Sequence, residues 1–568
     1  MRRMNSTIKA PGRILGGPIK GAETLVWCAL AAIVALSHLR IAHGPLLSND
    51  GYQYLSVANN FLTGNPANTS IIHFDPERSW GRVPAPLTTF PPGYPLAVAA
   101  VDTTGVGIEP AALLVSVLSF VLLVPLFAWG ARTLSSNGGV TRTLLACLIG
   151  NSWVAIYATS ATTESLFTLV SSAAIIVLLA AGARAEAFVT QTGSAPQPGP
   201  AAARSNPPGY LRLLLLGSAL IGLSYWVRYA GLFLLAGVGV FHLMQLARRR
   251  DRPALQALLS LAVAAAIIGA GFVRNQLLVG SWKGGNTKVV HHPLKEVFRE
   301  FILWMHHLFF GGIADARAGV PEVLLLLGIL AIVLATVYRR GGPTPQRRRL
   351  TAGPTLLLCY AAVYCAGMVY LGVTSVISFD TRMFYPVLPV LLLLLAVALT
   401  AAVESTASTP QRALVFTGGL LLATCAYLVI NARSYFTPLP PAPHEGIERQ
   451  LEGEATSGMT LRQWLEAHVP STATIVANRG QASAYALHRN TVSLITSEYS
   501  DQQWNEPAMR ALMRRFGARY LILYTGDAPS LVTLSESPFL AGLAQGARSD
   551  WLTPAARNHD VLVFEATP

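Results

Sequence analysis

Long apolar runs, separated by shorter polar stretches, dominate the chain. Eleven of these runs reach about 17 residues, and a helix needs about 20 apolar residues to cross a bilayer. Their approximate windows are 22–42, 108–131, 143–158, 164–183, 210–227, 229–247, 254–273, 320–338, 354–374, 384–403 and 413–430. Because no small-residue cleavage site follows the first window, we interpret it as a span and not as a signal peptide. The pattern predicts an all-α polytopic membrane domain of about 11 transmembrane helices over residues 1–430.

The composition excludes most soluble architectures. Of the 568 residues, 52% are hydrophobic and 12% are charged, whereas about 25% are charged in a typical soluble protein. The five cysteines all lie in apolar runs, and none pairs at a metal-ligand spacing. Neither a disulfide framework nor a zinc site is therefore expected.

The net charge of +14 follows the order of the loops. Lysine and arginine concentrate in alternate loops, including ARRRDR at 247–252 and YRRGGPTPQRRR at 338–349. By the positive-inside rule the N-terminus is cytoplasmic, so the charge reflects topology in the cell (inner) membrane and no nucleic-acid partner is expected. A Pro/Ala/Gly/Ser-rich stretch at 185–208 is predicted to be a cytoplasmic linker. The polar segments that then face outward are 43–107, 274–319 and 431–568.

The C-terminal segment has a different pattern. Short apolar, strand-like runs alternate with amphipathic helical stretches, which is typical of a small α/β domain. The expected strands are 473–478, 491–495, 519–524 and 560–566, and the expected helices are 461–469, 481–489 and 506–517. The sequence predicts an extracytoplasmic α/β domain over residues 431–568, without a phosphate-binding glycine motif.

Ionisable residues gather on the predicted outer side, and such residues at membrane depth indicate function. Asp50 opens an amphipathic stretch at 48–64, where it could cap a helix or act as a base at the mouth of an active site. Two short helical hairpins bring Glu164 and Arg228 to membrane depth, where they could pair with each other or line a wet cavity. Arg382 precedes a span, where it could pair with Asp380 or hold an anion such as a phosphate.

Two further signals are weaker. His73, Asp75 and Glu77 alternate in HFDPE, a pattern that could bind a divalent metal ion. The histidines of the loop 274–319 fit an interfacial amphipathic helix better than a ligand set. We therefore expect no certain cofactor, and leave a divalent metal open.

Several motifs, in their order along the chain, resemble those of the GT-C superfamily of integral-membrane glycosyltransferases. The bacterial relatives of protein O-mannosyltransferases and the aminoarabinose lipid A transferase are the most similar members. The motifs are NDGYQYLSVA (49–58), FPPGYPLAVAA (90–100), TESLF (163–167), RYAGL (228–232) and TRMFYPVLPVLLLL (381–394).

The resemblance implies an inverting transfer of a hexosyl or pentosyl group from a polyprenyl-phosphate carrier. The acceptor would be a glycan, a lipid or a protein at the outer face of the bilayer. It also implies that Asp50 is, or orients, the catalytic base, and that Arg228 and Arg382 bind the carrier phosphate. Gly51 stands where many relatives have a second acid, which leaves metal dependence open. Phe90 stands where the aminoarabinose type has lysine, which disfavours lipid A aminoarabinose transfer.

The sequence thus predicts one site and leaves one alternative function. The predicted catalytic residues are Asp50 and Glu164; the predicted substrate-binding residues are Tyr54, Tyr94, Arg228, Tyr229, Arg274, Asp380 and Arg382; no metal ligand is assigned. The alternative is a transporter or lipid flippase with an extracytoplasmic docking domain. A transporter built from repeats would show charges near mid-membrane and two related halves, and the sequence shows neither clearly.

Overall fold

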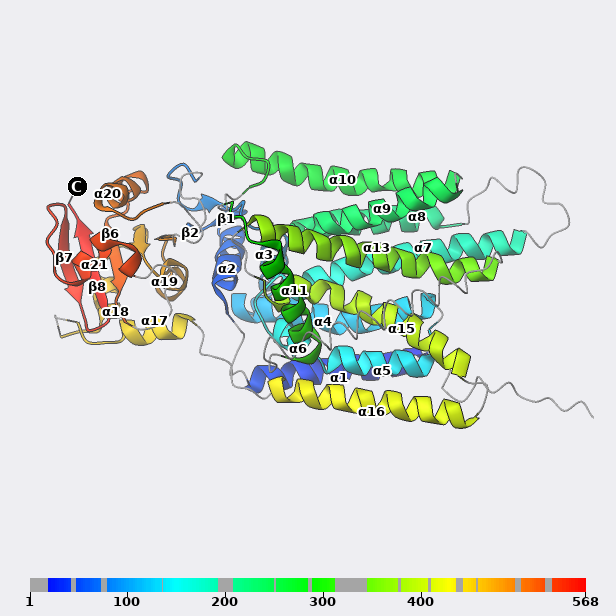
Figure 1. Cartoon of the computed structure of the whole chain (residues 1–568). Coiled ribbons are helices and arrows are strands. Elements are labelled where there is room, and N and C mark those ends of the chain that lie inside the picture. Colours follow the sequence, from blue (N-terminus) through cyan, green and yellow to red (C-terminus); the bar gives the residue numbers. More distant parts are fainter. Residues whose placement is uncertain are drawn as a thin grey trace, which may run out of the picture.

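The computed structural model describes most of the chain. The described residues are 19–41, 47–72, 79–134, 136–192, 208–249, 252–284, 289–311, 345–375, 379–406, 410–435, 443–455, 458–495, 502–526 and 534–567. Two parts are visible in Figure 1: a bundle of long helices and a smaller sheet-containing domain, with short elements between them.

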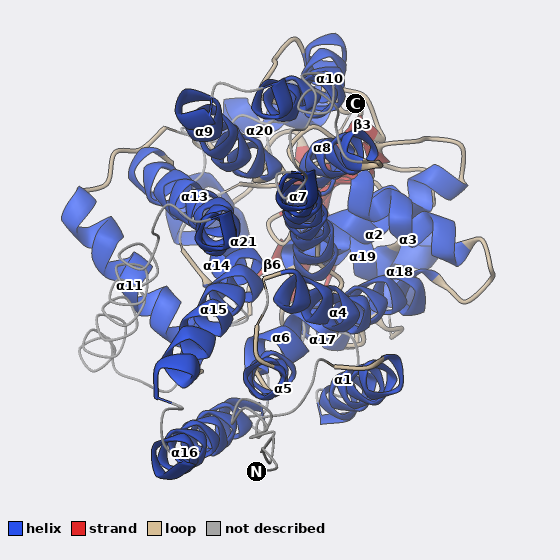
Figure 2. Cartoon of the chain, turned by 90° about the vertical axis from the view of Figure 1, so that its right-hand side faces the viewer, coloured by secondary structure: helices blue, strands red, loops and turns tan. Residues whose placement is uncertain are grey.

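Nine helical stretches within these described ranges are long and apolar enough to cross a membrane, so the chain is a multi-pass membrane protein. The bundle helices are α1 (Gly21–Ile41), α4 (Ile108–Thr133), α7 (Glu164–Thr192), α8 (Tyr210–Val227), α9 (Gly231–Arg249), α10 (Arg252–Val279), α13 (Pro345–Thr374), α14 (Thr381–Phe384), η3 (Tyr385–Val387), α15 (Leu388–Thr406) and α16 (Pro410–Tyr435). Figure 2 shows the bundle end-on, with α7 near its centre and α1, α10 and α16 at its periphery. The apolar window of α7 is accordingly 67% buried, whereas that of α16 is 11% buried.

The predicted span 143–158 is two helices, α5 (Gly138–Ile149) and α6 (Ser152–Ala158), bent by 59°. The bend has a local cause, because Asn151 leaves the helical path and caps α6 by accepting a hydrogen bond from the Val154 amide at 3.1 Å. The Asn431 side chain of α16 accepts from the Ser152 amide at 3.0 Å. The broken backbone is thus satisfied by side chains, as a non-helical segment at membrane depth requires.

Two other predictions need comment. The window 320–338 lies outside the described residues. The predicted linker 185–208 begins too early, because α7 continues to Thr192. The residues 185–192 extend an apolar helix by two more turns and include Ala and Glu, which favour helix.

Three short helices and two short strands lie where the bundle meets the smaller domain. They are α2 (Asn49–Leu62), α3 (Gly93–Asp102), α11 (Leu294–Phe310), β1 (Asn68–Thr69) and β3 (Ala85–Pro86). The strands β1 and β3 pair antiparallel. The predicted amphipathic stretch 48–64 is the helix α2, which Ser48 caps, and the apolar run after Pro92 is the short helix α3.

The smaller domain contains a six-stranded mixed sheet. Its elements are α17 (Pro443–Leu451), α18 (Leu461–His468), β4 (Ile475–Ala477), α19 (Gly480–Leu487), β5 (Thr491–Ser493), α20 (Glu506–Arg515), β6 (Tyr520–Tyr524), η4 (Leu534–Glu536), α21 (Pro538–Ala544), β7 (Leu552–Arg557) and β8 (Val561–Ala566). The strand order is β2-β5-β4-β6-β8-β7, in which β2 is Ile71–Ile72. The first four strands are parallel to one another, and β8 and β7 are antiparallel additions. The fold class is therefore a polytopic helical bundle with a small α/β domain, as predicted.

The edge strand β2 (Ile71–Ile72) comes from the first polar segment and not from the C-terminal one. Thr491 donates its amide to the Ser70 carbonyl at 2.8 Å, next to this pairing. The predicted boundary at 430 falls inside α16. The segment after α1 and the C-terminal domain are consequently joined through one sheet.

Candidate active site

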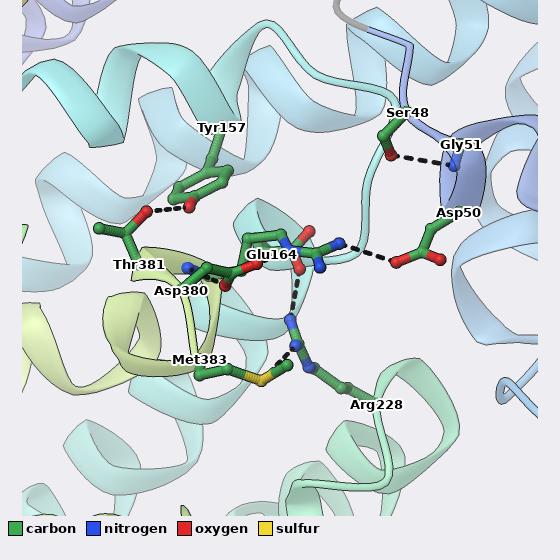
Figure 3. Close-up of polar contacts among 10 residues, drawn as sticks. Ser48, Asp50, Gly51, Tyr157, Glu164, Arg228, Asp380, Thr381 and Met383 are labelled. Carbon is green, nitrogen blue, oxygen red and sulfur yellow. Dashed lines mark hydrogen bonds and ion pairs between the residues drawn. The ribbon is translucent and has the colours of Figure 1, made fainter. Parts of the chain in front are cut away.

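Five charged residues from four separate segments meet at one end of the bundle (Figure 3). Asp50 opens α2, Glu164 opens α7, Arg228 follows α8, and Asp380 and Arg382 lie at the start of α14. Each is at a helix end, so each can reach the same place from a different helix. The sequence predicted each of these residues as a site residue.

Asp50 is free of the capping role that the sequence offered it. The Ser48 hydroxyl accepts a hydrogen bond from the Gly51 amide at 3.3 Å and caps α2. The Asp50 carboxylate instead accepts from Arg382, with 2.8 Å between Oδ2 and Nη1. A carboxylate in the first turn of a helix is also favoured by the helix dipole.

Arg382 is shared between two carboxylates. Its Nε donates to Asp380 Oδ2 at 2.6 Å, in addition to the Asp50 contact. Asp380 also caps α14, because its Oδ1 accepts from the Arg382 amide at 2.9 Å. The three side chains are 27–31% exposed, so solvent or a ligand can reach them. The predicted Asp380–Arg382 pair is present, and Asp50 joins it from far along the chain.

Glu164 and Arg228 form a more deeply buried pair. The carboxylate Oε1 and the guanidinium Nη1 are 2.5 Å apart, and the Glu164 side chain is 4% exposed. Nη2 of Arg228 also contacts the sulfur of Met383 at 3.4 Å, which links this pair to α14. Taken together, three carboxylates surround two guanidinium groups, so the cluster carries one carboxylate in excess. Such a carboxylate can accept a proton, and the two guanidinium groups can bind an anion.

The other predicted residues divide into two groups. The ring of Tyr54 is buried against Phe90 and Tyr94, and it lies within electrostatic reach of the charged cluster. Burial raises the pKa of Tyr54 well above its usual range, so it stays a hydrogen-bond donor. Tyr94 donates to the Ala112 carbonyl at 3.3 Å and is fully buried. Tyr94 therefore packs between α2 and α4, and its hydroxyl is bonded to the backbone and not to a charged side chain.

Tyr229 and Arg274 bind backbone carbonyl groups of the loop before α3. Tyr229 donates to the Thr88 carbonyl at 2.7 Å, and Arg274 donates to the Leu87 carbonyl at 2.8 Å. The Asn275 side chain connects them, because it donates to the Tyr229 hydroxyl at 3.2 Å. The structure thus gives these two residues a role in holding the loop.

Sequence reasoning missed three neighbours of the site, Tyr157, Thr381 and Met383. The Tyr157 hydroxyl and the Thr381 hydroxyl are 2.5 Å apart, directly beside the Asp380–Arg382 pair. The signal was weak, since Thr381 adjoins two charged residues and Tyr157 lies in an apolar run. Met383 was also missed, because a thioether carries no charge pattern.

The contact between α2 and the C-terminal domain was also missed. Tyr52 is fully buried; its hydroxyl lies 3.0 Å from His444 Nδ1 and accepts from the His444 amide at 3.0 Å. The rings of Tyr52 and Tyr485 are 5.0 Å apart, and the Tyr485 hydroxyl donates to the Glu109 carboxylate. Burial raises the pKa of Tyr52 above its usual range. This contact fixes the helix that carries Asp50 between the bundle and the sheet.

Metal ligation was also left open by the sequence. Within the described ranges, no group of three or more His, Cys, Asp and Glu residues is placed to hold a metal ion. His73, Asp75 and Glu77 lie outside these ranges.

No protein-family model and no curated protein match the sequence. Solved structures match with confidence. The aminoarabinose transferase ArnT from Cupriavidus metallidurans in the apo state has a TM-score of 0.56 at 13% identity, covering 96% of this chain and 99% of that chain. Its complex with undecaprenyl phosphate has a TM-score of 0.50 at the same identity and coverage.

Two larger proteins match as well. The oligosaccharyltransferase AglB from Archaeoglobus fulgidus, in complex with an inhibitory peptide and a dolichol-phosphate, has a TM-score of 0.55 at 13% identity, covering 88% of this chain and 69% of that chain. The arabinofuranosyltransferase AftD from mycobacteria has a TM-score of 0.52 at 16% identity, covering 97% of this chain and 40% of that chain. At these identities the likeness shows the fold, and the predicted GT-C fold is confirmed.

Proposed function

We propose that this chain is an inverting glycosyltransferase that moves a sugar from a polyprenyl-phosphate carrier to an acceptor hydroxyl at the outer face of the membrane. The observation that carries the proposal is the contact of Asp50 with Arg382 beside the Glu164–Arg228 pair. These contacts bring together a carboxylate that can accept a proton and two guanidinium groups that can bind a phosphate. The shared fold with ArnT and AglB, whose structures contain undecaprenyl phosphate and dolichol-phosphate, supports a carrier of this class.

The first step in this proposal is an exchange of anions. The carrier phosphate approaches Arg382 and takes the position that the Asp50 carboxylate occupies at Nη1. Asp380 stays in place, because it also caps α14. Since the cluster holds one carboxylate in excess, the departing Asp50 leaves no cation unpaired. The donor thereby frees the base that the reaction needs.

The second step is a single displacement at the anomeric carbon. Asp50 accepts the proton of the acceptor hydroxyl, whose oxygen bonds to the anomeric carbon on the face opposite the phosphate. The bond from that carbon to the phosphate oxygen breaks, and its electron pair leaves with the carrier phosphate. Arg382 and Arg228 stabilise the charge that develops on this oxygen. One displacement inverts the anomeric configuration. Glu164 keeps Arg228 in position.

The proposed sidedness is supported by the arginine residues at the end of the bundle opposite the charged cluster. There, Arg142 pairs with Glu23 at 2.6 Å and Arg132 donates to the Ile19 carbonyl at 3.3 Å, at the start of α1. The exposed arginines of α7 to α10 lie at the same end. By the positive-inside rule this end would face the cytoplasm, and the charged cluster and the C-terminal domain would then lie at the outer face of the cell (inner) membrane. A glycan, lipid or protein acceptor would then approach from the C-terminal domain.

The decisive test is Asp50→Asn in proteoliposomes supplied with polyprenyl-phospho-sugars and candidate acceptors. Removing a positioned base costs about 10²–10⁴ in rate, so we expect transfer to fall by about that factor while insertion and carrier binding persist. Asp102→Asn, a second aspartate of the same polar segment, serves as the matched control and should leave the rate unchanged. Transfer by Asp50→Asn within threefold of the unsubstituted protein would overturn the proposal.

A further inference from the structure

A cavity of about 180 Å³ opens at the end of the bundle opposite the charged cluster. It lies between α7, α8, α9 and α13, next to the start of α10. Glu164 begins α7 at the charged cluster, and the lining residue Glu186 lies 22 positions further along the same helix, about 33 Å away. The cavity is therefore separate from the proposed active site.

His242 lines this cavity and has an unused ring nitrogen. The residue is 6% exposed, and its Nε2 has no hydrogen-bond partner among the residues described. A buried polar group without a partner is costly and calls for an explanation. Because the nitrogen belongs to a cavity-lining residue, a bound molecule can supply the missing hydrogen bond.

Most of the remaining lining is aliphatic or aromatic, including Leu178, Leu214 and Phe241. The acidic residue of the described lining, Glu186, already has an interaction partner. The Tyr210 hydroxyl is likewise bonded, to the Pro253 carbonyl at 3.2 Å. The cavity thus suits an apolar chain that carries a hydrogen-bonding group at the depth of His242.

The end of the bundle at which the cavity lies is cationic. On each of four helices an exposed arginine lies one to three positions from a lining residue: Arg184 on α7, Arg212 on α8, Arg248 on α9 and Arg252 on α10. The Arg184 guanidinium lies beside Gly209 at the N-terminus of α8, a second feature that favours an anion. Along α9 the polarity rises from buried His242 through Gln245 to exposed Arg248, over about 9 Å.

From this gradient we propose that the cavity binds one anionic glycerophospholipid of the adjacent leaflet. An acyl chain enters the apolar part, an ester carbonyl accepts a hydrogen bond from His242 Nε2, and the phosphate group lies among the four arginines. Basic pockets between helices at a cytoplasmic membrane surface bind lipids of this type. The site is independent of the proposed transfer reaction, and its bound lipid would stabilise the packing of α7 to α10.

Native mass spectrometry of the full chain, after delipidation and addition of defined lipids, tests the site. We expect phosphatidylglycerol to be retained at least tenfold more strongly than phosphatidylcholine. The fourfold variant Arg184→Gln, Arg212→Gln, Arg248→Gln and Arg252→Gln should lose this preference. A matched variant that removes four exposed arginines elsewhere, Arg299→Gln, Arg449→Gln, Arg514→Gln and Arg548→Gln, should keep it.

A second variant keeps the test valid if the fourfold variant does not fold. His242→Leu preserves the rim charges and the apolar volume but removes the ring nitrogen, and we expect retention to weaken by about threefold to tenfold. Equal retention of both lipids would overturn the proposal. The proposal would also be overturned if lipid retention were unchanged in His242→Leu and the preference for phosphatidylglycerol were unchanged in the fourfold variant. If the fourfold variant does not fold, the double variant Arg212→Gln/Arg252→Gln takes its place. Displacement of the lipid by millimolar inorganic phosphate would instead indicate a site for a soluble anion, and would also overturn it.

Discussion

Arg382 and Arg274 lie at the same end of the bundle, but they use their guanidinium groups differently. Arg382 donates to the carboxylates of Asp50 and Asp380, whereas Arg274 donates to the backbone carbonyl of Leu87 and to the side-chain oxygen Oδ1 of Asn275. A carboxylate partner can be exchanged for another anion such as a phosphate, because both offer negatively charged oxygens to the same guanidinium N–H groups. A backbone carbonyl is part of the fold and has no such substitute. The partner therefore distinguishes an arginine that can bind substrate from one that holds a loop.

Substitution of Arg228, the second arginine with a carboxylate partner, should have the largest effect on stability and activity. In Arg228→Gln the buried Glu164 loses its cation, and an unpaired buried charge costs about 3–5 kcal/mol. We expect the midpoint of denaturant unfolding to fall accordingly, together with transfer activity. The double variant Glu164→Gln/Arg228→Gln should recover most of the stability and none of the activity. Recovery of both would mean that the pair is structural only.

Arg382→Gln should affect catalysis more than folding. Its side chain is 31% exposed, so the loss of its ion pairs costs less stability than the loss of Arg228. Removing a preorganised donor at a developing charge costs about 10²–10³ in rate, which is the fall in kcat/KM that we expect. Arg382→Lys keeps the charge without the fork and should recover part of the loss. An unchanged KM and kcat in Arg382→Gln would assign this arginine to the same class as Arg274.

Arg274→Gln should affect the stability of a loop more than catalysis, the reverse of the expectation for Arg382→Gln. Hydrogen bonds from a charged donor contribute about 1.5–3 kcal/mol, and their loss should free the loop around Leu87. We expect faster proteolysis of this loop and a kcat within about threefold of the unsubstituted protein. A hundredfold fall in kcat at unchanged stability would contradict the comparison.

Tyr52→Phe should have the smallest effect. It removes one hydroxyl that bonds His444, worth about 1 kcal/mol, but it keeps the ring contact with Tyr485. We expect a loss of about that size in stability, with transfer reduced no more than threefold. Tyr52→Ala removes the whole ring and should weaken the contact between α2 and the C-terminal domain. We expect Asp50 to be displaced as a result and sugar transfer to fall. Equal transfer rates for the two variants would show that the domain contact does not position the base.

Much of the fold follows from hydropathy, because a bilayer leaves few alternatives for a run of about 20 apolar residues. The elements that hydropathy did not predict have local causes, which an average over a window of residues does not detect. Gly150 and Asn151 interrupt an apolar run, and Asn431, 280 residues beyond Asn151, accepts hydrogen bonds from the amide and the hydroxyl of Ser152 at this break. The strand β7 contains Pro554 at a bulge, so its pattern does not alternate. The strand β2 is two residues long and becomes a strand only through its partner.

The candidate site was predictable as a set of residues but not as a geometry. Asp380 and Arg382 are two positions apart, and their pairing follows from local structure. Asp50 and Arg382 are 332 positions apart, so only the tertiary structure pairs them. The predicted topology assigned Arg274 to the site together with Arg228 and Arg382, because topology predicts the end of the bundle at which a residue lies. It does not predict which group each side chain contacts. Capping was also ambiguous, since Ser48, Asn49 and Asp50 are all good caps.

The edge strand β2 constrains how the protein can be made. Ile71 pairs with Thr491, about 420 residues later in the chain. At a synthesis rate of about 5–20 residues per second, the ribosome needs roughly 20–80 s to deliver the partner strand. During that time the helix that carries Asp50 has emerged, but neither the sheet nor the Tyr485 contact exists to hold it. Assembly of the reactive end is thus the last event of biogenesis, and a nascent chain that stalls late would insert fully yet stay inert.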